Sequence, residues 1–294
     1  MNKHTTWDPG GRAIFNEANE EEPLVFGHTF NETGKVLAAR HNAMEEKGRE
    51  MGFQVITTCI IGSQNYKLDT KDSDFDTCSI VLPNWDHYII DGDIPTHTYV
   101  FDNGQSTIRS CHSFVDCLYK LGHTTIEPLY TNLSVVNPKF APLWNILREN
   151  RTKILYGHPN SFFKSSFGFG QSMYKRMLNK KDEKYRADLG YCPKAFSHYI
   201  RNLAMIRMYC AHFEDIYHTA FEKWLQMVKQ GEKMNFSGNL IAMLADQYDK
   251  WEQQTQKMNW LDDPEVDTLL RLWLLECGRI MVENYNGEDI NACD

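Results

Sequence analysis

The sequence lacks the features that define several broad classes of protein. No apolar run approaches the ~18 consecutive residues of a membrane-spanning helix, and the start of the chain, residues 1–23, has no apolar core of a signal peptide. We therefore expect no membrane partner and a cytoplasmic location. The eight cysteines include no CxxC pair and are scattered over a long chain, so we expect free thiols rather than disulfides or a thiolate metal site.

The composition is that of an ordinary globular protein. The chain has 294 residues, a length that fits two packed domains or one large one. Of these residues 42% are hydrophobic, 13% aromatic and 24% charged, which is enough apolar material for a sizeable core. The net charge of −8 argues against nonspecific nucleic-acid binding by the whole molecule. Residues 164–207, however, carry ten basic and three acidic side chains. A basic segment in an acidic protein is typical of a polyphosphate or RNA-backbone site.

The order of the periodic segments predicts an α+β protein with three parts. Residues 1–32 form an extended lead-in, residues 33–160 form a small mixed β-sheet domain with helices, and residues 161–294 form an all-helical domain. The last part contains apolar residues at helical spacing, which predict helices over residues 171–179, 194–224, 238–257 and 267–284.

The sheet is predicted from β-branched runs and from one turn signal. Residues 53–61 and 75–82 are β-branched runs, and Asp102-Asn103-Gly104 separates two further strand-like segments. An Asx-Gly pair favours the positive φ of a tight hairpin turn. A helix ended by Gly52 is expected to precede the first strand.

Residues 60–80, IIGSQNYKLDTKDSDFDTCSI, contain the strongest chemical signal. In a strand, Asp74 and Asp76 would emerge on one face with Cα atoms ~6.5 Å apart while Phe75 points into the core. Two such carboxylates suit a partly hydrated Mg²⁺. Upstream, Gly62 allows close approach of a ligand, and the Ser63 hydroxyl with the following amides can hold phosphate oxygens.

This arrangement resembles the DNA polymerase β superfamily of nucleotidyltransferases. More narrowly, it is similar to the GSxxYGLxTPxSDxD signature of the predicted nucleotidyltransferases called RlaP-like or YcgL-like. Lys67 replaces the usual Gly of that signature. The helix-forming segment KAFSHYIRNL, residues 194–203, resembles the KxxSHxIRLL helix of the same family, and the likeness spans roughly residues 33–260. The matching signature residues are Gly62, Ser63, Tyr66, Leu68, Thr70, Ser73, Asp74 and Asp76.

The resemblance implies a catalytic domain that binds a nucleoside triphosphate, ATP among them, with Mg²⁺ or Mn²⁺ on Asp74 and Asp76. The superfamily adds a third carboxylate from a neighbouring strand, but the expected strand, QSTIRSC, contains none. Asp102 and Glu127 are the nearest candidates. Either one of them substitutes, or two carboxylates suffice, or the protein binds nucleotide without turnover. The nucleotide-binding residues that we expect are Gly62, Ser63, Tyr66, Ser73, Lys175, His198 and Arg201, with Arg176 as a further basic candidate.

Three functions remain open at this point. The first is a metal-dependent nucleotidyltransferase that moves a nucleoside monophosphate to a hydroxyl on an RNA end, a protein or a small molecule. The second is a catalytically weak nucleotide-binding or regulatory module. The third is a toxin or antiphage nucleotidyltransferase acting on tRNA or protein. The sequence leaves the oligomeric state open.

Overall fold

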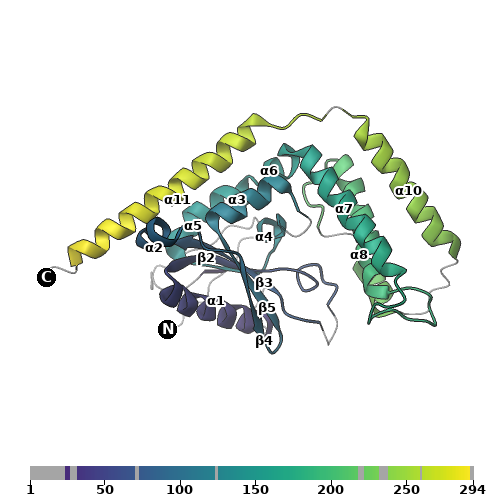
Figure 1. Ribbon diagram of the computed structural model, residues 1–294, viewed down its shortest axis with the longest axis horizontal. Coiled ribbons are helices and arrows are strands. Elements are labelled where there is room, and N and C mark those ends of the chain that lie inside the picture. Colours follow the sequence, from purple (N-terminus) through teal and green to yellow (C-terminus); the bar gives the residue numbers. More distant parts are fainter. Residues whose placement is uncertain are drawn as a thin grey trace, which may run out of the picture.

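The computed structural model describes residues 24–26, 32–69, 73–122, 125–217, 222–231, 238–258 and 260–291. The protein has a mixed α+β fold built around one mixed sheet of order β1-β6-β2-β3-β5-β4 (Figure 1). β3 and β5 are parallel, and the other neighbours are antiparallel. The strands are β1 (Leu24–Phe26), β2 (Phe53–Ile60), β3 (Thr77–Pro83), β4 (His97–Phe101), β5 (Gly104–Ser110) and β6 (Ser134–Val136).

Helices cover both faces of the sheet. In Figure 1, α1 lies on one face, and α3, α5 and α11 lie on the other. All described regular elements after β6 are helical. The helices are α1 (Glu32–Met51), α2 (Trp85–Asp91), α3 (Cys111–Lys120), α4 (Glu127–Tyr130), α5 (Ala141–Glu149), α6 (Arg151–Gly157), α7 (Pro159–Met177), α8 (Pro193–Cys210), α9 (Glu222–Gln230), α10 (Gly238–Gln256) and α11 (Pro264–Asn291), with a 3₁₀ turn, η1, at Pro138–Phe140.

The predicted hairpin and first strand are confirmed, but two predicted boundaries are wrong. β3 begins at Thr77, so Asp74 and Asp76 precede the strand instead of lying within it. The predicted helix over residues 194–224 is two helices, because α8 ends at Cys210 and α9 begins at Glu222. Between them Tyr217 is 2% exposed and stacks against Tyr66, with ring centroids 6.2 Å apart. Tyr217, which follows the end of α8, thus contributes a buried ring to the core.

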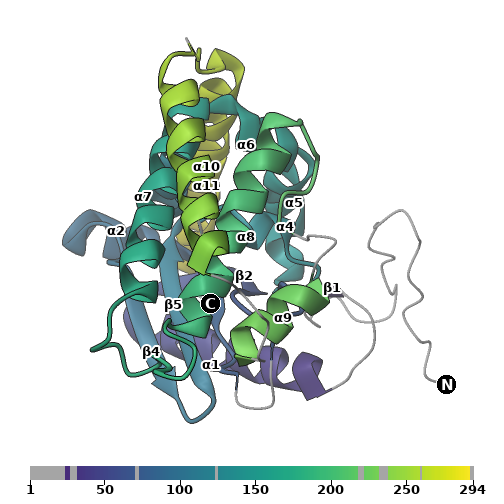
Figure 2. The same cartoon turned by 90° about the vertical axis from the view of Figure 1, so that its right-hand side faces the viewer.

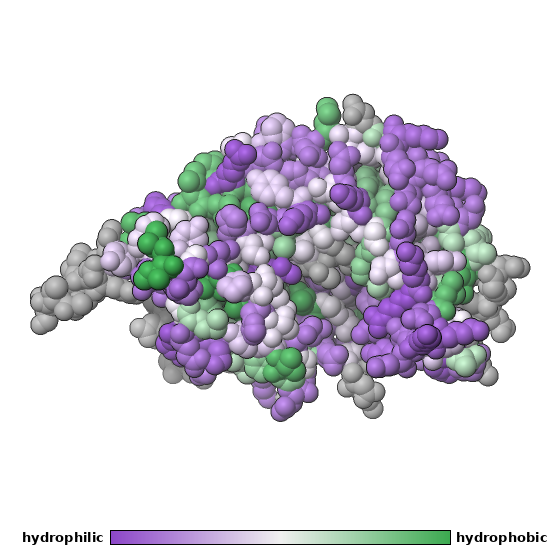
Figure 3. Space-filling model, in the orientation of Figure 1, coloured by the Kyte–Doolittle hydropathy of each residue, from purple (hydrophilic) through white to green (hydrophobic). Residues whose placement is uncertain are grey.

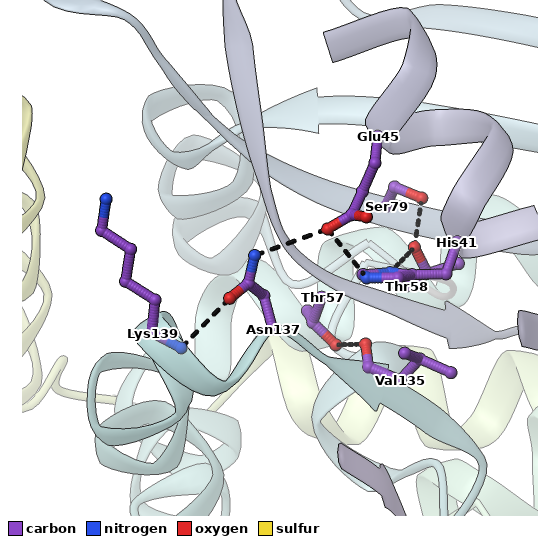
Figure 4. Close-up of polar contacts among 8 residues, drawn as sticks. All are labelled: His41, Glu45, Thr57, Thr58, Ser79, Val135, Asn137 and Lys139. Atoms are coloured by element: carbon purple, nitrogen blue, oxygen red, sulfur yellow. Dashed lines mark hydrogen bonds and ion pairs between the residues drawn. The ribbon is translucent and has the colours of Figure 1, made fainter. Parts of the chain in front are cut away.

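A buried polar network fastens α1 to the sheet (Figure 4). The Nδ1 atom of His41 lies 3.0 Å from the Thr58 hydroxyl, which lies 2.9 Å from the Ser79 hydroxyl. On its other side, the His41 ring lies 3.4 Å from Glu45. This acid, imidazole and hydroxyl arrangement resembles a catalytic triad in composition, but Thr58 and Ser79 are fully buried within the sheet. The network therefore joins α1 to β2 and β3, the two strands whose ends carry the candidate site.

One hydrophobic cluster runs from the sheet into the C-terminal helices. It includes Ile56 of β2, Trp144 of α5, Phe196 of α8 and Trp273 of α11. α11 therefore returns to pack on the helices that cover the sheet. The division near residue 160 into two domains stays a prediction, as does the lead-in, most of which lies outside the described residues.

The described cysteines are all free thiols, as the sequence predicts, while Cys293 lies outside the described residues. Among the helices of the described ranges, none is long and apolar enough to cross a membrane.

Candidate functional site

A cavity of about 740 Å³ lies where the sheet meets the helices α8 and α9. The sheet side contributes the turn after β2 and the segment before β3. The helical side contributes the connection between α7 and α8, the first turns of α8 and the end of α9. The residues that line the cavity are Gly62, Ser63, Ser73, Asp74, Asp76, Lys184, Lys194, His198, Lys229 and Gln230.

The turn after β2 begins at Gly62, whose φ of 77° lies in the left-handed region that favours glycine. Its carbonyl accepts a hydrogen bond from the Tyr66 amide at 3.3 Å, and the Ser63 carbonyl accepts one from the Leu68 amide at 2.9 Å. Lys67 follows with a φ of 54°. In the signature that this segment resembles, the corresponding residue is Gly, which adopts this backbone conformation most easily.

Glu127 supports this turn from behind. One of its carboxylate oxygens accepts hydrogen bonds from the Gly62 amide at 2.6 Å and from the Asn65 side chain at 3.1 Å. The residue is 0% exposed. Burial raises the pKa of Glu127 to about 7, although the neighbouring Tyr66 hydroxyl and Arg201 favour its ionised form. Glu127 does not line the cavity, so it positions the Gly62 turn instead of facing a ligand there.

Arg201 also lies beneath the turn. Its guanidinium stacks on the Tyr66 ring at 3.5 Å from the centroid, and the residue is 3% exposed. Neither Arg201 nor Tyr66 lines the cavity. Arg201 thus lies with Glu127 in the layer that holds the turn, and the ring of Tyr66 is the part of the turn that packs on it.

The β4–β5 turn holds the segment that carries the two aspartates. The Phe75 amide donates to the Asn103 carbonyl at 2.7 Å, and the Gln105 amide donates to the Asp76 carboxylate at 3.3 Å. A Cβ atom on Gly104 would lie only 2.5 Å from the Phe75 carbonyl oxygen. Gly104 therefore permits a backbone contact that sets the positions of the aspartates on either side of Phe75.

Phe75 itself points into the core, as the sequence predicts. It is buried against Leu37 of α1, Ile60 of β2 and Val135 of β6. Since Phe75 is anchored, Asp74 and Asp76 are left to face the cavity, where Asp74 is exposed and Asp76 is partly buried. The Ile61 amide donates to the Asp76 carbonyl at 3.0 Å, so the two sequence motifs are joined directly.

The two carboxylates suit a hydrated divalent cation. Burial raises the pKa of Asp76, and the nearby negative charge of Asp74 raises it further, against the backbone hydrogen bond from Gln105. A cation bound to both carboxylates would relieve this repulsion. Oxygen donors with room for water or phosphate are the ligands that Mg²⁺ prefers.

The helical side of the cavity is basic. Lys194 and His198 are four residues apart near the start of α8 and share one helix face. Burial is the main cause that lowers the pKa of Lys194, while the charges of Asp74 and Asp76 raise it. Burial also lowers the pKa of His198 to about 3, so this ring is neutral and offers hydrogen bonds without charge. Lys184 reaches the cavity from the connection between α7 and α8, a hydrophilic surface in Figure 3.

α9 is joined to the loop between the two motifs. The Lys229 ammonium donates to the Leu68 carbonyl at 2.7 Å and lies 3.4 Å from the Ser73 hydroxyl. The Gln226 amide donates to the Asp69 carbonyl at 2.7 Å. Figure 2 shows α9 beside α8 at this end of the molecule. Burial and the charge of Lys194 lower the pKa of Lys229 to about 8.

The structure brings some of the predicted site residues together and leaves others apart. Six of them line the cavity, namely Gly62, Ser63, Ser73, Asp74, Asp76 and His198. Lys175 lies in a separate small cavity with Tyr199 and Tyr248. Arg176 lies 2.7 Å from Asp182, to which it is ion-paired.

Asp102 lies exposed in the β4–β5 turn and does not line the cavity. The register of the parallel pair sets Thr77 opposite Ser106, so Gln105 is the neighbour of Asp76 on β5. The residue of β5 beside Asp76 therefore carries an amide and not a carboxylate. In the part of the chain described, no group of three or more His, Cys, Asp or Glu residues has the geometry to hold a metal.

Sequence reasoning missed three lysines of the cavity. Lys184 and Lys194 belong to the basic segment, residues 164–207, which its charge balance marks as a candidate phosphate site. Nothing in the sequence distinguishes these two lysines from the other basic residues of that segment. Lys229 had no signal, because it lies in a separate helix that only the tertiary fold brings to the site.

Comparisons with known proteins do not assign this site. No protein-family model matches the chain, and no curated protein matches it in sequence.

Proposed function

We propose that the protein is a metal-dependent nucleotidyltransferase that moves a nucleoside monophosphate from a nucleoside triphosphate to a hydroxyl acceptor. The observation that supports the proposal is the cavity that has Asp74 and Asp76 on the sheet side and Lys184, Lys194 and Lys229 on the helical side. A metal-bound triphosphate presents cations, which the carboxylate pair can ligate. It also presents anionic oxygens, whose charge the lysines can neutralise.

Each part of the cavity has a role in this proposal. Asp74 and Asp76 would hold Mg²⁺ or Mn²⁺, which when bound polarises the phosphoryl oxygens and steadies the leaving pyrophosphate. Ser63, on the turn that Glu127 supports, would bind phosphate oxygens. Lys194, near the N-terminus of α8 where the helix dipole is positive, would neutralise the charge of the triphosphate.

The layout of a catalytic sheet domain followed by a helical domain belongs to the same proposal. In this layout, α8 and α9 supply the phosphate-binding lysines and the sheet supplies the carboxylates. The contacts of Lys229 and Gln226 with the loop at Leu68 and Asp69 would couple the two parts when nucleotide binds.

A label-transfer assay tests the activity. The protein is incubated with Mg²⁺ or Mn²⁺, each α-labelled nucleoside triphosphate, and pools of RNA and protein, and both transfer and pyrophosphate release are followed. We expect transfer that Asp74→Ala and Asp76→Ala abolish. Asp116→Ala is the matched control, because Asp116 is exposed on α3 and does not line the cavity.

The second candidate function is a nucleotide-binding module without turnover. The specific observation that favours it is Gln105, which stands beside Asp76 on β5 without a carboxylate to activate an acceptor hydroxyl. Metal-dependent nucleotide binding with no pyrophosphate release for any acceptor pool would favour the module over the transferase.

A further inference from the structure

Arg40 of α1 is a buried cation beside the candidate site. It is 3% exposed, and it does not line the cavity that holds Asp74 and Asp76. Its guanidinium lies over the Phe101 ring, 3.5 Å from the centroid, and donates a hydrogen bond to the Asn103 side chain. Phe101 ends β4, and Asn103 lies in the β4–β5 turn. Both contacts of Arg40 are therefore made with the turn that holds the aspartate segment.

Two hydrogen bonds connect Arg40 to that segment. The first joins the guanidinium to the Asn103 side chain, and the second joins the Asn103 carbonyl to the Phe75 amide at 2.7 Å. Phe75 lies between Asp74 and Asp76 in the chain, so its backbone position sets the direction of both carboxylates. A displacement of Asn103 therefore displaces the pair.

The same face of α1 contacts the aspartate segment at a second point. Leu37 lies three residues before Arg40, so the two side chains share one face of the helix. Leu37 packs against the side chain of Phe75 in the core. One helix face thus contacts the Phe75 side chain directly and the Phe75 amide through Asn103.

Packing alone does not explain a cation at this place. The Nη1 atom of Arg40 is buried and has no hydrogen-bond partner in the part of the chain that the structure describes. A buried charged donor without a partner destabilises a fold, and apolar side chains of similar volume often replace buried charges without loss of stability. Burial lowers the pKa of Arg40, while the charges of Asp76 and Asp102 raise it and offset part of this cost. A side chain that costs stability and holds one turn is the pattern expected of a functional position.

We propose that Arg40 is a positioning residue that sets the geometry of Asp74 and Asp76 through Asn103 and Phe75. The inference rests on the proposed function, because it takes these two aspartates as the metal ligands. Arg40 touches neither the nucleotide nor the metal in this role.

Calorimetric titration of the full chain with Mn²⁺ tests the role. Arg40→Met removes the hydrogen bond to Asn103, and Asn103→Ala removes the same bond while it keeps the charge of Arg40. Asn103 is exposed and its φ is not positive, so alanine should leave the fold intact. We expect each variant to weaken Mn²⁺ binding by about tenfold. The double variant should weaken it no further, because both changes act through one contact.

Arg148→Met is the matched control. Arg148 is a partly buried arginine of α5 that donates to the Thr131 carbonyl at 3.4 Å and does not line the cavity. This variant should bind Mn²⁺ as the wild type does. Urea unfolding separates positioning from a purely structural role, since Arg40→Met should be as stable as the wild type while its Mn²⁺ affinity falls. An Arg40→Met protein that loses stability but keeps its Mn²⁺ affinity would overturn the proposal.

Hydrogen exchange of the Phe75 amide gives a readout that needs no metal. Released from the Asn103 carbonyl, this amide should exchange about tenfold faster in Arg40→Met and in Asn103→Ala than in the wild type. Faster exchange in both variants, with a wild type that binds no Mn²⁺, would overturn the proposed metal site and leave Arg40 as the residue that positions the segment. Unchanged exchange and unchanged Mn²⁺ affinity in both variants would overturn the role of Arg40 itself.

Discussion

The backbone amide of Gly62 donates a hydrogen bond of 2.6 Å to the buried carboxylate of Glu127. These residues are 65 positions apart in the chain, and the bond fixes the turn that carries Ser63 into the cavity. The carboxylate behind the turn, with Arg201 and Tyr66 packed beside it, supports this part of the cavity wall.

We expect the free energy of unfolding to depend on pH through the carboxyl group of Glu127. Its folded pKa of about 7 lies above the ordinary 4.5, so the stability it contributes is fully present below pH ~4.5 and is lost as the pH rises through about 7. The loss amounts to at most about 3 kcal/mol at the usual 1.36 kcal/mol per pH unit. Urea unfolding of the wild type and of Glu127→Gln over this range measures it. The two free energies of unfolding should diverge, and parallel curves would show that Glu127 titrates normally.

A methyl group on Gly104 should disturb the carboxylate pair. Gly104→Ala would press on the Phe75 backbone and displace Asp74 and Asp76, so we expect Mn²⁺ affinity to fall by about tenfold or more, which a misplacement worth ~1.4 kcal/mol produces. Calorimetric titration with Mn²⁺ measures the change. Gly92→Ala is the control, because Gly92 also has a positive φ but open space around it. Equal Mn²⁺ affinity in both variants would show that the β4–β5 turn does not determine the positions of Asp74 and Asp76.

Lys229 should contribute to nucleotide affinity in a pH-dependent way. Its pKa of about 8 means that the ammonium loses its charge as the pH rises above that value. We expect triphosphate binding by the wild type to weaken above pH ~8, whereas Lys229→Arg keeps its charge and should bind with a flatter pH profile. Fluorescence titration with a labelled nucleotide analogue across this range makes the comparison.

The size of the Lys229 effect is measured by removing the amine. Lys229→Ala should weaken binding by about tenfold or more, as expected for a charge-assisted hydrogen bond worth ~1.5–3 kcal/mol. Lys223→Ala is the matched control, since Lys223 is exposed on the same helix and does not line the cavity. If the two variants bind the nucleotide analogue with equal affinity, Lys229 serves only to hold the Leu68 carbonyl.

Lys67 is expected to strain the turn between the two motifs. Its φ of 54° costs a non-glycine residue roughly 1 kcal/mol, so Lys67→Gly should raise the free energy of unfolding by up to about that amount. Lys47→Gly, inside α1 one turn before its last residue, should lower it by a similar amount. Denaturant unfolding gives both values, and a destabilised Lys67→Gly would contradict the strain at this position.

The sequence predicts local structure well and the assembly of the cavity only in part. The Asx-Gly turn has a short-range signal and forms the predicted hairpin, while the Gly-Ser and Asp-x-Asp motifs come together at one cavity whose ligand stays a prediction. β1 and β6 were missed because three residues are too few for a periodicity. Glu127 is an instructive case, since its position in the sequence made it a candidate for the third catalytic carboxylate, and only the tertiary structure shows that it is buried against the Gly62 turn.

The most direct test of the central claim is calorimetric titration of the protein with a non-hydrolysable nucleoside triphosphate, with and without Mg²⁺. The account predicts binding that needs Mg²⁺, that weakens by about tenfold or more in both Asp76→Asn and Lys194→Ala, and that is unchanged in Asp116→Asn. Binding that is equal without the metal, or that both cavity variants leave intact, would contradict the assignment of this cavity to a metal-bound triphosphate.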